Sequence, residues 1–126
     1  MKHLKLFKES FGGEYKEVDA ETWILFGKIT RFMDSKLNKV IELVKSKGFT
    51  DYYITNGIGG AGGAKEVINF EKRTDKFKTK VIIRSMEDEW FKVRIETSKK
   101  TQVTYDKQWY LCDQFDGLLK FIEEVL

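Results

Sequence analysis

The chain has 126 residues, of which 41% are hydrophobic and 14% are aromatic, so it is long and apolar enough to fold as one domain around a buried core. This composition excludes a disordered chain. The single cysteine, Cys112, excludes an internal disulfide and is typical of a reducing, cytoplasmic setting. The longest apolar runs, such as Trp23 to Phe26, are too short to cross a bilayer, and no secretion signal opens the chain. We therefore expect a cytoplasmic protein without a membrane partner, whose net charge of +3 does not by itself indicate a polyanionic one.

The N-terminal stretch Met1–Phe11 admits two interpretations. Leu4 and Phe7 recur at helical spacing, whereas Leu4 and Leu6 alternate as they would in a strand. Two consecutive glycines end the stretch. The sequence therefore predicts a single domain over 1–126, in which residues 1–13 could form a separate N-terminal segment.

The same stretch carries a resemblance. It begins Met-Lys and continues with an apolar run that contains Phe and an acidic residue, and it resembles the opening of many small accessory proteins of large tailed bacteriophages. The absence of proline and the nineteen lysines against four arginines fit an AT-rich genome. The resemblance covers 11 of the 126 residues. It implies an accessory factor encoded by a phage or mobile element that acts in the host cytoplasm, and in some packaged phage proteins such a leader is removed.

A long helical pattern follows. Asp19 is placed as an N-cap, and apolar residues then recur close to every 3.6 residues from Trp23 onward. Gly48 stands where a left-handed C-cap is expected. The pattern predicts a helix of about 28 residues, or roughly 42 Å, which is more than a small domain needs. A break near Asp34–Ser35 is therefore expected, with Asp34 as the cap of a second helix.

The remainder of the chain is strand-like until its last helix. The predicted strands alternate apolar and polar residues. The first is a short aromatic strand that begins at about Asp51 and runs into a glycine-rich loop, and the others lie at Glu66–Glu71, Phe77–Ser85, Trp90–Glu96 and Gln102–Asp106, the last with an extension over Trp109–Leu111 left open. A helix with an apolar stripe begins at about Asp113. The predicted class is α+β in two layers: a long N-terminal helix, whole or broken, an antiparallel meander of four to five strands, and a C-terminal helix, with both helices on one sheet face.

The alternation also predicts a register. To keep apolar residues on one face, Ile83 should oppose Phe91 and Ile95 should oppose Val103. The connections would then have odd numbers of residues, centred near Glu87 in the first case. A two-residue turn would place apolar residues on the wrong face.

A glycine-rich loop joins the first strand to the second. Its Gly57–Gly62 segment matches G-x-G-x-x-G, but the strand pattern that follows does not open a helix, so the match to a dinucleotide site is formal only. A Walker A loop fails because Gly63 occupies the lysine position. The bare N–H groups could form a nest for a small anionic ligand that contains a phosphate or nucleotide, or the glycines could serve only a bulge and tight packing. The candidate ligand residues are Asn56, Gly57, Gly59, Gly60, Gly62, Gly63 and Lys65.

A second candidate site is a basic sheet face. The predicted register would place Lys80 opposite Arg94, Arg84 opposite Trp90, and Lys92 near Asp106. Because like charges directly opposite each other are unfavourable, such clustering suggests a use. An exposed tryptophan among cations suits an acidic protein surface or single-stranded nucleic acid, although a solvated face would look similar. The residues of this face are Lys78, Lys80, Arg84, Trp90, Lys92 and Arg94.

Catalysis finds little support in the sequence. His3 is the only histidine and lies near a chain end, Cys112 has no evident partner, and the acidic run Glu87–Glu89 lacks the ligands of a calcium loop. No cofactor or metal is expected, although an enzyme that uses Asp, Glu or Tyr stays open. The sequence favours a non-catalytic protein that docks on a host protein, with a small anionic ligand or nucleic acid as the alternatives.

Overall fold

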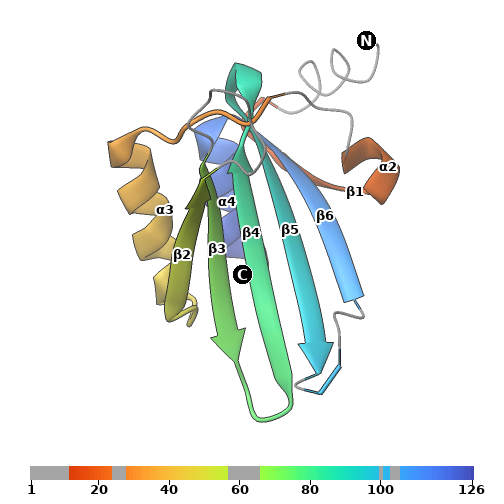
Figure 1. Cartoon of the computed structure of the whole chain (residues 1–126). Coiled ribbons are helices and arrows are strands. Elements are labelled where there is room, and N and C mark those ends of the chain that lie inside the picture. The colour runs from red at the N-terminus through yellow and green to blue at the C-terminus, as the bar shows by residue number, and fades with distance from the viewer. Residues whose placement is uncertain (1–11, 24–27, 57–65, 100, 103–105) are drawn as a thin grey trace.

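The computed structural model describes residues 12–23, 28–56, 66–99, 101–102 and 106–126. These residues form a six-stranded sheet and three helices (Figure 1). The elements in chain order are β1 (Tyr15–Val18), α2 (Ala20–Trp23), α3 (Asp34–Ser46), β2 (Asp51–Asn56), β3 (Glu66–Arg73), β4 (Phe77–Ser85), a 3-10 turn (Glu87–Glu89), β5 (Trp90–Lys99), β6 (Asp106–Asp113) and α4 (Gln114–Val125). None of the helices in this part of the chain combines the length and the apolar character needed to cross a bilayer.

The sheet is antiparallel throughout, in the order β1-β6-β5-β4-β3-β2. Strands β2 to β6 form the predicted meander, which is confirmed. The sequence did not predict β1, a four-residue strand that pairs with β6. The sheet is therefore one strand larger than expected, and its two edges are β1 and β2.

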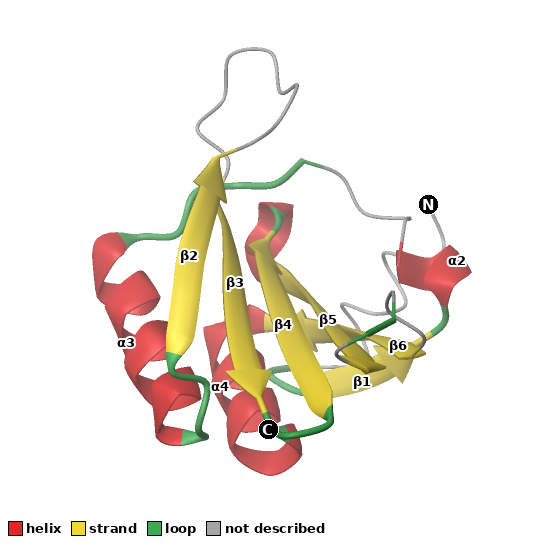
Figure 2. Ribbon diagram, turned by 60° about the horizontal axis from the view of Figure 1, so that its bottom comes forward, coloured by secondary structure: helices red, strands yellow, loops and turns green. Residues whose placement is uncertain are grey.

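Two helices cover one face of this sheet, as the alternation predicts. In Figure 1, α4 lies behind the strands and α3 stands beside β2, and the tilted view of Figure 2 shows both helices on the same side while α2 stands apart near β1 and β6. The two-layer α+β class is confirmed. The core between the layers includes Val40, Val44, Ile68, Phe70, Val81, Ile83, Phe91, Val93, Leu118, Phe121 and Ile122.

The long N-terminal helix is wrong as a continuous element. Asp19 does cap α2, since its Oδ1 accepts the Thr22 N–H at 2.7 Å. However, the chain over 28–33 is not helical. Ile29 forms an antiparallel bridge with Met86, beside the turn between β4 and β5. The backbone pairing of Ile29 with Met86 therefore takes the place of the helix that the apolar spacing predicts for this segment.

The second half of the helical pattern folds as predicted, with one shift. The break falls before Asp34, but Met33 holds the N-cap position and Asp34 is the first residue of α3. At the other end, Gly48 has the predicted left-handed backbone, with φ +95°. Phe49 then turns back into the core, where only 4% of it is exposed.

The predicted register is wrong in both hairpins. Ile83 opposes Val93, two residues further along than expected, so parity is kept and the connection between β4 and β5 is odd. Ile95 opposes Gln108 because the last strand begins only at Asp106. Val103 lies outside the described residues. The expected pairs Lys80–Arg94, Arg84–Trp90 and Lys92–Asp106 are therefore all wrong.

The N-terminal strand is held by α4. The N–H of Gly12 donates to Asp113 Oδ2 at 2.9 Å, and the Tyr15 hydroxyl donates to Glu124 Oε1 at 2.7 Å. Gly117 of α4 lies against the backbone that leads into β1. A Cβ at this position would stand 2.5 Å from the carbonyl oxygen of Glu14. The glycine is thus required by a close approach of two backbones.

The short distance between α4 and the backbone at Glu14 predicts that Gly117→Ala destabilises the protein. Helix propensity alone would favour alanine by about 1 kcal/mol, but the clash with a backbone oxygen should outweigh it and cost roughly 1–3 kcal/mol in net terms. Urea unfolding of both proteins measures the difference. An alanine variant more stable than the parent would contradict the close approach.

Candidate functional site

All six residues predicted for the basic face lie on one side of the sheet. In β4, Lys78, Lys80 and Arg84 alternate with the core residues Val81 and Ile83, and the register places the β5 residues on the same side. We call the side of the sheet away from α3 and α4 the open face; Figure 1 is viewed from this side. The β5 residues of the prediction on this face are Trp90, Lys92 and Arg94.

Two of these residues cannot contact a partner in this state. Trp90 is fully buried and forms a second apolar cluster with Met86 and Leu111, against which Ile29 packs. Lys92 is only 5% exposed. The expectation of an exposed tryptophan is therefore wrong. It failed because the segment that follows α2 returns to the sheet and covers this end of the open face.

Trp23 of α2 is part of this cover. Its ring lies 5.7 Å from the guanidinium carbon of Arg84 and 5.4 Å from the Lys92 ammonium, both measured to the ring centroid. Arg84 and Lys92 are also directly opposite each other in β4 and β5. Like charges that face each other, here with Lys92 buried and Arg84 partly buried, are unfavourable, and contact with the negative face of the indole offsets part of that cost. Sequence reasoning missed Trp23 because its spacing assigned it to a helix core.

The pKa values of both Arg84 and Lys92 are lowered, in each case mainly by burial. Burial, and after it the charge of Arg84, lowers the pKa of Lys92 to about 8. The pKa of Arg84 is lowered by burial first and by the charge of Arg94 second. The Nε of Arg84 is buried without a hydrogen-bond partner among the described residues. This end of the open face is thus cationic but largely closed.

The rest of the open face carries charges of both signs. Glu71, Lys80, Glu96 and Lys107 oppose one another in turn across β3, β4, β5 and β6. We call these four residues the charge ladder. Neighbouring pairs are of opposite sign, which is the favourable arrangement across strands. Like charges do stand opposite each other elsewhere on this face, in the pairs Arg84–Lys92 and Arg73–Lys78.

Further ion pairs neutralise the cations beside the ladder. The Nζ of Lys78 lies 3.5 Å from Glu71 Oε1. The Nε of Arg94 lies 2.7 Å from Glu96 Oε2, although not at a hydrogen-bonding angle. These pairs are partly exposed and add little stability. Their consequence is that the open face offers no continuous track of one sign.

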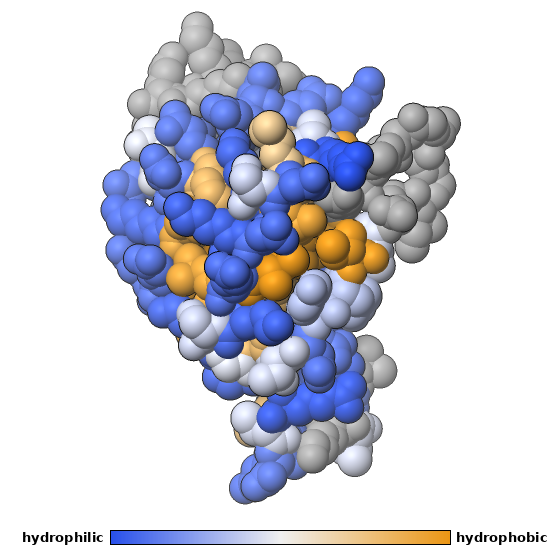
Figure 3. Space-filling model, turned by 90° about the vertical axis from the view of Figure 1, so that its left-hand side faces the viewer, coloured by the Kyte–Doolittle hydropathy of each residue, from blue (hydrophilic) through white to orange (hydrophobic). Residues whose placement is uncertain are grey.

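The edge strand β2 is the most apolar exposed part of the described chain. Tyr52, Tyr53 and Ile54 follow one another and are 42%, 43% and 39% exposed. The register places Tyr52 and Ile54 on the helix side of the sheet and Tyr53 on the open face. We call these three residues the β2 patch. Figure 3 views the side of the molecule where α3 and β2 lie, and shows apolar surface there within a hydrophilic surround.

A lysine stands over each tyrosine of this patch. The ammonium of Lys45, in α3, is 5.5 Å from the Tyr52 ring centroid. The ammonium of Lys80, in β4, is 5.7 Å from the centroid of Tyr53. Both distances are typical of cation–π contacts. The β2 edge therefore has an aromatic ring and a positive charge on each of its two faces.

α3 runs antiparallel to β2 (Figure 1). Ile41, one turn before Lys45 in α3, is partly buried against the core.

The glycine loop joins two adjacent antiparallel strands. Asn56 at the end of β2 is paired with Glu66 at the start of β3, so the loop closes a hairpin and does not lead into a crossover helix. A dinucleotide site of the βαβ kind is therefore excluded here. The candidate residues Gly57, Gly59, Gly60, Gly62, Gly63 and Lys65 and the side chain of Asn56 lie outside the described residues. An anion-binding nest in this loop stays a prediction.

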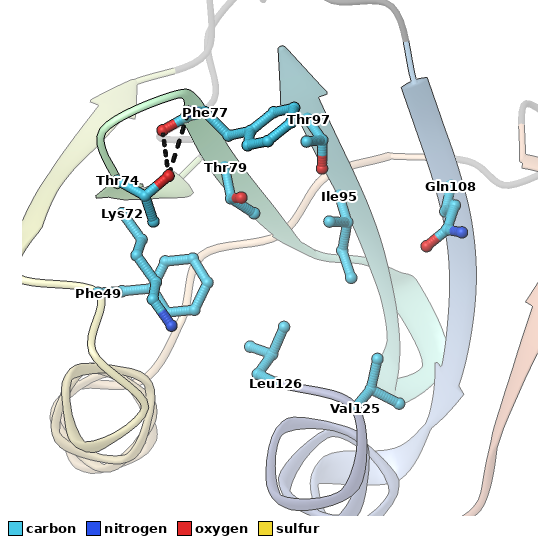
Figure 4. Close-up of a pocket in the computed structure, with 10 residues that line it drawn as sticks. All are labelled: Phe49, Lys72, Thr74, Phe77, Thr79, Ile95, Thr97, Gln108, Val125 and Leu126. Atoms are coloured by element: carbon cyan, nitrogen blue, oxygen red, sulfur yellow. Dashed lines mark hydrogen bonds between the residues drawn. The ribbon is translucent and has the colours of Figure 1, made fainter. Parts of the chain in front are cut away.

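A cavity of about 530 Å³ opens on the helix side of the sheet. It lies where β4, β5 and β6 extend past the end of α4, and Figure 4 shows the side chains around it. Lys72 is its only lining cation, and that ammonium already donates to the Lys47 carbonyl and stands over the Phe49 ring. The lining does not provide the converging donors of a phosphate site. Its residues are Phe49, Lys72, Thr74, Phe77, Thr79, Ile95, Thr97, Gln108, Val125 and Leu126.

The described residues provide neither a reactive thiol nor a cluster of metal ligands. Cys112 is fully buried, and burial raises the pKa of its thiol well above the ordinary value, which disfavours the reactive thiolate. The described residues contain no cluster of three or more side chains suited to hold a metal ion. His3 lies outside them. The two surfaces described above, the β2 patch and the open face, are the candidate sites among the described residues.

Comparison with protein-family models, with curated proteins and with solved structures found no match to this chain.

The burial of Trp90 predicts a large loss of stability for Trp90→Ala. Removing a fully buried indole should cost about 3–5 kcal/mol of the free energy of unfolding. Urea unfolding measures the loss, with Trp109→Ala as the matched control because Trp109 is only partly buried. Equal and small losses in the two variants would show that Trp90 is not a core residue.

Lys92 predicts a pH dependence of stability. The folded pKa of about 8 lies below the ordinary 10.5, so the unfolded chain binds more protons between these values and stability rises with pH across that window. Below pH 8 Lys92 is charged in the folded protein, and the full free-energy cost of burying this charge lowers stability. Lys92→Met removes this cost, so the free energy of unfolding of the parent should approach that of the variant between pH 8 and 10.5. A constant difference across this window would contradict the burial of a charged Lys92.

Proposed function

We propose that this protein is a non-catalytic accessory factor that binds another protein along the β2 edge of its sheet. The adjoining open face forms the flank of the contact. The mechanism is occlusion: a rigid sheet edge covers a surface of the partner and blocks or redirects it. The resemblance of Met1–Phe11 to phage accessory proteins supports a partner from the host and a site of action in the host cytoplasm.

One observation carries this proposal, namely the three consecutive exposed residues of the β2 patch. The described chain has five exposed large hydrophobic residues, and the other two, Met33 and Val125, stand elsewhere in the sequence. Contiguous apolar surface on a monomer marks interaction sites more often than single exposed residues do. Tyrosine is also among the residues enriched in protein interfaces.

The charge ladder favours a protein partner over nucleic acid. Binding to a polyanion gains its affinity from cations that neutralise successive phosphates. On the open face, Glu71 and Glu96 stand beside the cations that would do this. Alternating charges instead suit a protein surface with a complementary pattern, where they contribute to specificity. Binding of a small anionic ligand by the glycine loop is a separate proposal, which involves neither the β2 patch nor the open face.

The proposal predicts which apolar residues are needed for capture of a partner. The double variant Tyr52→Ser/Ile54→Ser should lose the protein that the parent chain recovers from a host lysate, because it removes apolar contact area at the patch. The matched control is Met33→Ser/Val125→Ser, which removes the other two exposed hydrophobic residues. Mass spectrometry of the eluates after capture compares the three proteins.

The control should recover the same partner as the parent. Circular dichroism and urea unfolding should show that both double variants keep the parent fold, since all four positions are exposed. If the β2 variant retains the partner while the control loses it, the docking surface lies elsewhere and the proposal fails.

A further inference from the structure

The β2 edge has the features of a strand that accepts another strand. In the described sheet β2 pairs with β3 alone, so its outer row of backbone N–H and C=O groups faces away from the sheet. Exposed edges are usually protected by charged residues or short length. β1, at the other edge, has both protections: it is four residues long and contains Lys16 and Glu17. β2 has six residues and one charge, Asp51, at its start.

Each face of this edge carries a lysine beside an aromatic ring, and on the open face Glu71 also lies opposite that lysine. Lys45 stands over Tyr52 on the helix side, and Lys80 stands over Tyr53 on the open face. Consecutive residues of an added strand point to opposite faces. Two adjacent acidic residues placed opposite Tyr52 and Tyr53 would therefore point to the two faces that carry Lys45 and Lys80, one residue on each face. The neighbouring position opposite Ile54 suits a β-branched residue, and Asp51 disfavours a further acid at the other end.

A second copy of this chain fits the edge less well. If two β2 strands paired about Tyr53, the centre of the patch, Tyr53 would face its own copy. The Lys80 ammonium groups of both copies would then stand over the same pair of rings. Like charges brought together in this way are destabilising. An acidic segment meets the same lysines with opposite charge.

We propose that β2 binds an extended segment of its partner by β-strand addition, and that this segment carries two adjacent acidic residues between β-branched or aromatic residues. This inference rests on the proposed function and adds the mode of binding and the class of partner segment. Backbone hydrogen bonds along β2 supply affinity, and the two lysines select the acidic pair. The six residues of β2 accommodate a segment of roughly 20 Å.

A short synthetic peptide tests the chemistry. The probe is acetyl-Thr-Val-Glu-Glu-Val-Thr-amide with a fluorescent label, whose symmetrical order suits either strand direction. Fluorescence anisotropy with the full chain measures its affinity. Lys45→Glu and Lys80→Glu should each weaken binding roughly three- to tenfold. Lys39→Glu is the matched control: Lys39 is also in α3 but borders a groove with Leu119 of α4.

N-methylation of the peptide tests the mode of binding. In a bound strand, alternate amides point to β2 and the others point to solvent. Two peptides are methylated at one or the other alternate set. One should lose at least about tenfold in affinity, because its hydrogen bonds to β2 are removed, and the other should bind as the parent peptide does. Hydrogen exchange of the β2 amides should slow only with peptides that bind.

Equal binding of the two methylated peptides, or no binding of the parent peptide, would overturn strand addition by an acidic segment. Loss of the lysate partner in Tyr52→Ser/Ile54→Ser alongside either result would leave docking at β2 in place and reject only this mode. Retention of the lysate partner in that variant would instead reject the docking site itself.

Discussion

The structure depends on the burial of one face of a single antiparallel sheet. Two helices supply that cover, and the period-2 alternation of β4 and β5 sends Val81, Ile83 and Val93 to the covered side. The same alternation leaves their charged neighbours no alternative to the open face. The chemistry of the exposed side is thus a consequence of core formation. A one-residue slip in either strand would bury lysines and expose the core.

The charges on the open face are arranged in two ways. Near the start of β4 and the end of β5, the charge ladder alternates acidic and basic residues across four strands. At the other end, Arg84 and Lys92 meet as like charges and Trp23 lies over both. Burial, and after it the charge of Arg84, lowers the pKa of Lys92, so the charged form of Lys92 lowers stability at neutral pH. At the β2 edge, the exposed rings of Tyr52 and Tyr53 lie beside the ammonium groups of Lys45 and Lys80.

The sequence predicted the elements whose own residues determine them. β4 runs from Phe77 to Ser85 as expected, because strict alternation and a clear break on each side mark a half-buried strand. Gly48 ends α3 through its left-handed backbone. The six residues of the basic face do share one side of the sheet. Parity within a strand is a local property, and it can be predicted from one chain.

The errors arose where distant segments decide the outcome. β1 exists because β6 offers an edge, and no pattern in its four residues signals this. The exact register of each hairpin depended on loop conformations: the turn after β4 holds Asp88 and Glu89 at positive φ, which their residue types do not announce. Trp90 was placed on the correct face but assigned the wrong exposure. The chain that covers it comes from around Ile29, far away in the sequence.

The β2 patch was overlooked for a related reason. Tyr52, Tyr53 and Ile54 form an ordinary apolar strand in the sequence, and only the strand order shows that this strand is an edge. The glycine loop beside it, in contrast, can be recognised in the sequence from its composition alone. A tyrosine that alternates correctly gives no sign of whether a neighbour will cover it.

The central claim is that a partner protein contacts this chain along β2. In-cell photocrosslinking tests it most directly, with p-benzoylphenylalanine in place of Tyr53 in one version and in place of Val125 in the other, since both positions are similarly exposed. We expect a discrete crosslinked partner from position 53 and none from position 125. A crosslink from position 125 alone would contradict it.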